Sequence, residues 1–175
     1  MPFGTVRLYI RELRNKRLIT TGARGVNAPD MTPMDAARVT IAILGTDKPA
    51  HSADVVTDIG NLTVNRSYSK GDVPKFAKDL NYAVSLEEML EEFFTYQSNL
   101  SLAIRSIEVC RESREASVKF QHGEACFDAD YSAQQYILES GESRGRQTIV
   151  RLKSSDLLEL AGRLNISNAS KETKT

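Results

Sequence analysis

The chain has 175 residues with 23 basic and 23 acidic side chains, so its formal net charge is zero, and 41% of its residues are hydrophobic. This length accommodates one domain or two small ones with a real core, and the composition lies in the ordinary globular range. No apolar run approaches the ~20 residues that span a bilayer, and the amino terminus lacks the apolar segment of a secretory signal. We therefore expect a cytoplasmic protein with no membrane association.

The segment Thr5–Ile19 has the pattern of a basic amphipathic helix. Four apolar residues recur at spacings of three and four, which places them on one helical face: Val6, Tyr9, Ile10 and Leu13. Arginines repeat the same spacing on the flank of that face: Arg7, Arg11 and Arg14. Residues 1–24 hold six basic side chains and one acidic one, although the whole chain is neutral. We predict a helix that buries one face and carries positive charge beside it.

A hairpin is predicted directly after this helix, over residues 20–28. Gly22-Ala23-Arg24-Gly25 lies between two short extended segments, and its glycines can adopt positive φ. Arg24 is then at the tip of the turn. A guanidinium in that position suits a phosphate group or a DNA minor groove.

Four short motifs of this region resemble a winged helix-turn-helix: Gly4-Thr5-Val6, Leu13 through Leu18-Ile19, Gly22-x-x-Gly25 and Met31-Thr32-Pro33-x-Asp35-Ala36-Ala37. They are similar in particular to small prophage-type DNA-binding proteins of alphaproteobacteria, over roughly the first third of the chain. The resemblance implies that Thr5–Leu18 is the recognition helix and Thr20–Ala28 the wing. It also implies a DNA-binding surface with these members: Thr5, Arg7, Arg11, Arg14, Lys16, Arg17 and Arg24.

A helix-turn-helix has a supporting helix before its recognition helix, whereas only Met1-Pro2-Phe3-Gly4 precede Thr5. We expect either that the chain starts late or that a partner or a later segment supplies this support. A purely structural interpretation also stays open. In that interpretation the basic residues are the solvated flank of a core helix, and the two glycines belong to a common hairpin turn.

Two further helices are predicted before residue 61. Thr32, Pro33 and Asp35 provide an N-cap, a favourable first helical position and a reciprocal capping carboxylate. Residues 36–44 leave little polar face, which predicts the central core helix of the protein. A second helix is predicted from Pro49, closed by Gly60-Asn61. Residues 61–75 are polar and irregular, and we predict a loop or linker there.

The carboxy-terminal half changes from a helical to an alternating pattern. A capping-box spacing at Ser85 begins a predicted helix that extends to about Leu100, and its acidic side is interpreted as a solvated face: Glu87, Glu88, Glu91 and Glu92. Alternation then predicts antiparallel strands at residues 104–110, 116–120, 125–131 and 148–152. A last helix is predicted from Ser155-Asp156 to Leu164.

These elements predict an α+β fold. A winged-helix-like helical part comprises residues 1–60, a linker residues 61–82, and an α+β part with a small antiparallel sheet and a carboxy-terminal helix residues 83–165. The polar tail, residues 166–175, is predicted to be disordered.

Catalytic and metal-binding patterns are not found. Cys110 and Cys126 are the only cysteines, and we expect them to be reduced and packed. With His122 they do not have the spacing of a zinc site. The sequence contains no phosphate-binding loop, dinucleotide-binding turn, metalloprotease motif, serine-hydrolase motif or kinase motif. We predict a non-enzymatic protein without a cofactor or a metal.

Two functions remain for this sequence. The first is a DNA-binding protein, a phage-derived transcriptional regulator that acts as a homodimer through its basic helix and wing. The second is a protein-interaction or adaptor module without DNA binding of its own, whose basic helix docks on an acidic protein surface or on the Glu87–Glu92 face of the same protein. Neutral net charge favours the second function, because DNA-binding domains often carry net positive charge.

Overall fold

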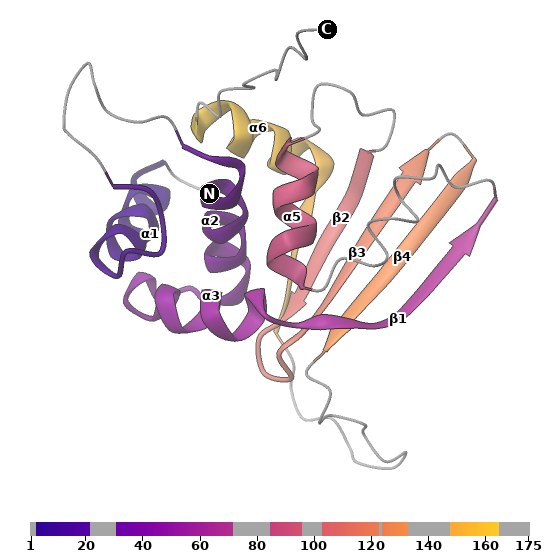
Figure 1. Ribbon diagram of the computed structural model, residues 1–175, viewed down its shortest axis with the longest axis horizontal. Coiled ribbons are helices and arrows are strands. Elements are labelled where there is room, and N and C mark those ends of the chain that lie inside the picture. Colours follow the sequence, from indigo (N-terminus) through magenta and orange to yellow (C-terminus); the bar gives the residue numbers. More distant parts are fainter. Residues whose placement is uncertain are drawn as a thin grey trace, which may run out of the picture.

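The computed structural model describes residues 3–21, 31–71, 85–95, 103–122, 124–132 and 148–164. It has the expected α+β fold (Figure 1). The helical segments are α1 (Phe3–Asn15), α2 (Pro33–Gly45), the 3-10 turn η1 (Pro49–His51), α3 (Ser52–Gly60), α5 (Leu86–Thr95) and α6 (Ser154–Leu164). The strands are β1 (Thr63–Lys70), β2 (Ala103–Cys110), β3 (Glu115–His122), β4 (Ala125–Ser132) and β5 (Ile149–Lys153).

Helix α2 is the central core helix, as its sequence predicts. Thr32 and Asp35 form the full capping box: Asp35 N–H donates to Thr32 Oγ1 at 3.1 Å, and Thr32 N–H donates to Asp35 Oδ2 at 2.9 Å. Every residue from Val39 to Gly45 is buried. The helix packs against α1 and α3 and also against α5 and the sheet (Figure 1), so apolar residues all round it are required.

The sheet is antiparallel, with the strand order β1-β4-β3-β2-β5. The strands predicted at 104–110, 116–120, 125–131 and 148–152 correspond to β2, β3, β4 and β5. One face contributes buried side chains to the core: Ile107, Val109, Val118, Phe120, Phe127, Ala129 and Tyr131. The opposite face is polar, and Glu108 there pairs with Arg151 on β5 at 2.9 Å and with Lys119 on β3 at 3.6 Å.

The prediction of a loop or linker over residues 61–75 was wrong for residues 63–70, which form β1. This strand pairs with β4 from Thr63↔Ser132 to Lys70↔Cys126, with a register shift between Val64 and Arg66. It lies at one edge of the described sheet (Figure 1). An edge strand is stabilised largely by backbone pairing and needs no apolar alternation, which is why its polar sequence resembles a loop.

The predicted end of the first helix was also wrong, because α1 ends at Asn15 and not at Leu18 or Ile19. Leu18 N–H donates to the Leu13 carbonyl and Arg17 N–H to the Arg14 carbonyl, both at 3.0 Å. These two bonds form a Schellman motif. Its left-handed position is Arg17, with φ 58°, where glycine is the usual residue. The absence of glycine hid this helix end from a reading of the sequence.

One hydrophobic cluster joins the two halves of the sequence. It contains side chains of α1, α2 and α3 together with those of α5, the sheet and α6, among them Leu13, Ile41, Phe94, Ile107 and Leu157. The predicted wing tip with Arg24, residues 72–82 of the predicted linker and the predicted disordered tail lie outside the described residues.

Candidate nucleic-acid interface

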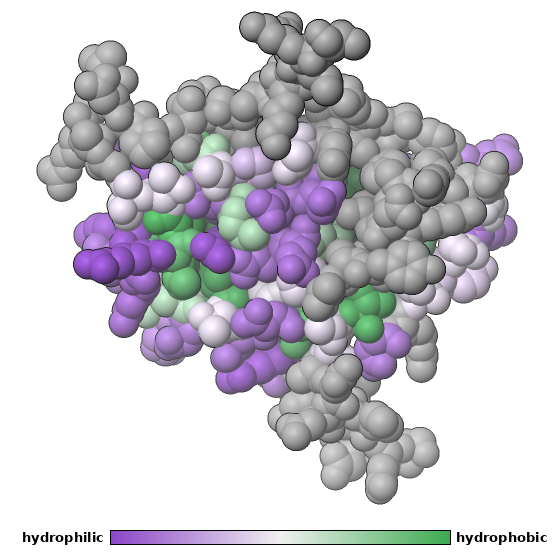
Figure 2. Space-filling view, in the orientation of Figure 1, coloured by the Kyte–Doolittle hydropathy of each residue, from purple (hydrophilic) through white to green (hydrophobic). Residues whose placement is uncertain are grey.

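Helix α1 separates an apolar face from a basic one. Val6, Tyr9 and Leu13 are at most 5% exposed and belong to the core. The basic residues of the helix and of the turn after it are all exposed: Arg7, Arg11, Arg14, Lys16 and Arg17. Thr5 is half-buried. Figure 2 shows hydrophilic residues at the outer edge of the side on which α1 lies, next to a hydrophobic patch, and Leu8 on α1 is 42% exposed. The structure thus exposes all the described basic members of the predicted surface, on α1 and in the turn that follows it.

The ion pair that Arg11 forms on this face is exposed to solvent. Arg11 Nη2 lies 3.3 Å from Glu12 Oε1, but the Arg11 side chain is 67% exposed. An exposed ion pair of this kind contributes about 0–1 kcal/mol and is weakened further by salt. Arg11 can therefore turn toward an external phosphate at little cost.

Later helices hold α1 in place. Tyr9 Oη donates to the Thr46 carbonyl at the end of α2, at 2.7 Å. Burial of this phenol raises the pKa of Tyr9, with a smaller opposing contribution from Arg111, so the hydroxyl stays a donor over the ordinary pH range. Helix α1 also packs against α2, η1 and α3. Later segments of this chain thus pack against the basic helix.

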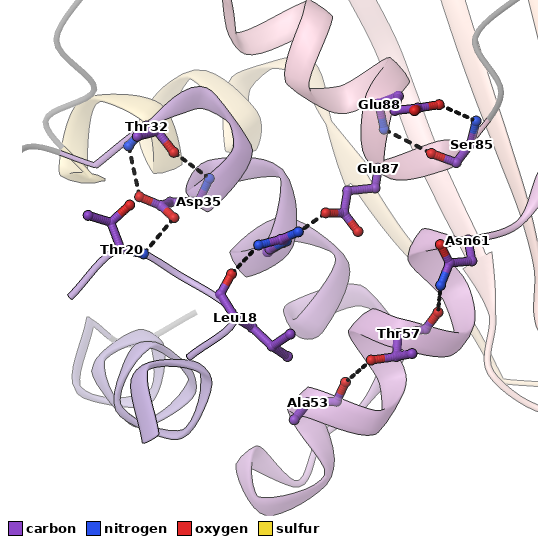
Figure 3. A network of polar contacts seen from close by, with 11 residues as sticks. Leu18, Thr20, Thr32, Asp35, Ala53, Thr57, Asn61, Ser85, Glu87 and Glu88 are labelled. Atoms are coloured by element: carbon purple, nitrogen blue, oxygen red, sulfur yellow. Dashed lines mark hydrogen bonds and ion pairs between the residues drawn. The ribbon is translucent and has the colours of Figure 1, made fainter. Parts of the chain in front are cut away.

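Two polar contacts fix the segment that follows α1 (Figure 3). Thr20 N–H donates to Asp35 Oδ1 at 2.8 Å, while the Leu18 carbonyl accepts a hydrogen bond from Arg38 Nη1. Asp35 is 3% exposed, and its carboxylate accepts two backbone N–H groups at the start of α2, where the helix dipole also favours negative charge. The path of the chain from Leu18 to Thr20 is therefore set by α2.

An ion pair between helices was missed from the sequence. Arg38 on α2 donates through Nε to Glu87 Oε1 on α5 at 2.6 Å, and the two side chains are 29% and 14% exposed. A charged residue within the otherwise apolar stretch 36–44 is the signal that could have revealed it, because such a residue requires a partner. The glutamates of α5 are thus not all solvated.

A second arginine joins the sheet to the helical layer. Arg111, in the turn between β2 and β3, donates through Nε to the Leu44 carbonyl at 3.1 Å. A cation at the carboxy-terminal end of α2 also complements its dipole. Nothing in the local sequence of the turn predicts this contact.

The two cysteines and the possible metal-ligating side chains are the remaining candidates for a reactive or metal-binding site. Cys110 is buried and Cys126 half-buried, and both are free thiols. Within the described ranges, no group of three or more His, Cys, Asp or Glu side chains is arranged to hold a metal ion. No helix in the same ranges is both long enough and apolar enough to cross a membrane.

We compared the chain with known proteins. No protein family, no curated protein and no solved structure matches the chain.

Proposed function

We propose that this protein binds DNA in the cytoplasm through the basic side of α1, as a phage-derived transcriptional regulator. The observation that carries the proposal is the set of five exposed basic side chains on one well-anchored helix and the turn after it. The winged helix-turn-helix resemblance of the same segment supports it. Buried contacts of Tyr9 and Leu13 keep the helix rigid, which is what a phosphate-contacting surface requires.

The dimensions of the basic side suit a DNA backbone. Arg7 and Arg14 are seven residues apart, which corresponds to about 10 Å along a helix. One strand of DNA advances about 3.4 Å for each nucleotide, so the helix spans about three phosphates. Guanidinium groups at this spacing give affinity without sequence preference, and any specificity requires additional contacts to base edges.

The chain has no net charge, but its basic and acidic residues lie on different elements, so a neutral protein can still bind DNA. Electrostatic attraction to a polyanion depends on the local surface, because interactions beyond about 10 Å are screened at ordinary ionic strength. The basic residues gather on α1, whereas the four glutamates of α5 belong to another element that packs on the far side of α2 from α1 (Figure 1). The DNA therefore meets mainly the basic side.

The test is fluorescence anisotropy with a labelled random-sequence duplex at several salt concentrations. With one phosphate contacted by each of Arg7, Arg11 and Arg14 and a fourth by Arg24 of the predicted wing, log K is expected to fall with log salt at a slope of about −3.6. A triple variant, Arg7→Ala/Arg11→Ala/Arg14→Ala, should lose most of this binding and flatten the slope by two to three units, at about 0.9 for each contact.

A charge-matched control separates a specific surface from general attraction. Lys48, Arg105 and Lys153 are exposed and lie outside α1, so their triple alanine variant removes the same charge and should keep the slope of the parent protein. Equal loss in both variants, or no binding of the folded parent even at low salt, contradicts the proposal. The second result favours the interaction module.

The interaction module remains the second candidate because of one observation. The exposed or half-buried glutamates of α5 form an acidic surface on the same neutral chain, so basic and acidic surfaces of comparable charge are both present. In this case an acidic protein, in place of DNA, binds α1, and the same triple variant abolishes that binding.

A further inference from the structure

An open groove of about 320 Å³ lies between helices α2 and α3 and the start of α5. Its volume is at the lower end of the range for small-molecule sites, about 300–1,000 Å³. Its apolar lining residues are Leu18, Met34 and Val56. Its other lining residues are polar, and Figure 3 shows them together with Leu18, which follows α1.

The polar side of the groove offers hydrogen-bond acceptors. Glu87 Oε1 is engaged by Arg38, but Oε2 receives no donor from the described residues and lies 2.8 Å from the point that a Cβ of Gly60 would occupy. Glu88 uses Oε2 to accept Ser85 N–H at 3.0 Å and keeps Oε1. Asn61 donates through Nδ2 to the Thr57 carbonyl and keeps Oδ1 as an acceptor. Three oxygen atoms therefore remain for a ligand.

An anionic ligand does not fit this arrangement. The start of α5 would attract an anion, but the reciprocal cap between Ser85 and Glu88 already places a carboxylate there. The positive charge of Arg38 is neutralised by Glu87 at 2.6 Å. The carboxy-terminal end of α3, marked by Asn61, faces the same groove, and its partial negative charge offsets the partial positive charge of α5.

The net charge of the groove is negative. Its lining contains one cationic side chain, Arg38, and two carboxylates, Glu87 and Glu88. One turn further along α5, burial raises the pKa of Glu91, and the neighbouring carboxylates of Glu92 and Glu87 raise it further. The neighbouring carboxylates of α5 therefore disfavour additional negative charge near the groove.

We propose that the groove binds a small aliphatic cation, an amine or a guanidinium group on a short alkyl chain. The cationic group lies against the free oxygens of Glu87 and Glu88 and the amide oxygen of Asn61, where charge-assisted hydrogen bonds are strongest. The alkyl chain packs against the apolar lining residues Leu18, Met34 and Val56. Gly60 makes this possible, because a side chain there would displace the Glu87 carboxylate. The site does not depend on the DNA-binding proposal.

The test compares two probes of nearly the same shape, the n-butylguanidinium ion and neutral n-butylurea. Binding is followed in the full-length protein through the amide signals in two-dimensional NMR spectra at low salt. We expect n-butylguanidinium to bind with a Kd of about 1 mM, a typical value for a ligand of this size, and to shift the signals of Gly60 and Asn61. n-Butylurea should cause no comparable shift.

Two glutamate variants on the same helix provide the control. Glu88→Gln keeps the capping geometry, since glutamine also serves at this position, and should weaken n-butylguanidinium binding about fivefold through loss of one nearby charge. Glu92→Gln removes the same charge outside the groove lining and should change the Kd less than twofold.

Four results would overturn the proposal: equal binding of n-butylurea, equal weakening by the two variants, no shift at Gly60 and Asn61 up to about 20 mM probe, or binding of inorganic phosphate at these residues.

Discussion

The arginines of α1 and Arg38 of α2 illustrate two uses of the same side chain. Arg11 is 67% exposed and forms an ion pair with its neighbour Glu12. Arg38 is 29% exposed and bonds both Glu87 on α5 and the Leu18 carbonyl after α1. A charge on a solvated flank remains available to a ligand, whereas a charge between packed helices is already committed to its partners. The first should affect binding and the second stability.

Removal of Arg38 should give the largest effect. Arg38→Ala leaves Glu87, 14% exposed, without its partner and frees the Leu18 carbonyl, so we expect about 3 kcal/mol of destabilisation. Urea unfolding measures this value. Arg14→Ala, on the exposed flank, should change stability by less than about 0.5 kcal/mol. Similar losses in the two variants would remove the distinction between the two arginines.

The next largest loss of stability is expected for Gly45→Ala, at the close contact between α2 and α3. A Cβ at Gly45 would lie 2.2 Å from Val55 Cγ1 and 2.8 Å from Ile59 Cδ1, so Gly45→Ala must displace these side chains of α3 and should cost about 2 kcal/mol. Gly4 on α1 has nothing within 4 Å of that position. Gly4→Ala is expected to stabilise the protein by up to about 1 kcal/mol through helix propensity. The thermal midpoints of the two variants should move in opposite directions.

Substitution of Arg17, at the end of α1, should change stability and DNA binding in opposite directions. Arg17 has φ 58°, a conformation that glycine adopts without steric cost, so Arg17→Gly should stabilise the fold by about 0.5–1 kcal/mol. The same variant loses a basic side chain and should weaken salt-dependent DNA binding. Arg17→Ala, which keeps the strained backbone, should not gain stability. A loss of stability in Arg17→Gly would mean that the side chain itself supports the core.

The smallest change in stability is expected for Glu91→Gln, on the acidic side of α5, and this change depends on pH. Burial, followed by Glu92 and Glu87, raises the pKa of Glu91 in the folded protein, so its ionised form opposes folding. A carboxyl whose pKa is raised on folding destabilises the protein above the folded pKa, and this penalty disappears as the pH falls below the unfolded value. Glu91→Gln should therefore be more stable than the parent by about 0.5 kcal/mol near neutral pH.

This advantage of Glu91→Gln should vanish at about pH 4, near the ordinary pKa of glutamate. Urea unfolding of both proteins at the two pH values measures it. Glu92→Gln, at an exposed position, is the control and should show a smaller dependence on pH. An advantage for Glu91→Gln that is independent of pH would assign its origin to packing.

Local sequence patterns determined much of the fold and the described part of the candidate site. The spacing of Val6, Tyr9 and Leu13 against Arg7, Arg11 and Arg14 predicted the two faces of α1. Thr32 and Asp35 predicted the start of α2. The strands of the central sheet followed from alternation, because each contributes one face to a core and one to solvent.

Tertiary structure alone decided the elements that depend on distant partners. Strand β1 exists because β4 offers it a hydrogen-bonding edge, and Arg38 is stable in α2 because Glu87, 49 residues later, lies beside it. The groove likewise combines Leu18, Asn61 and Glu88, which are far apart in the sequence. Periodicity records which face of a segment is buried, but it contains no information on which distant segment covers that face.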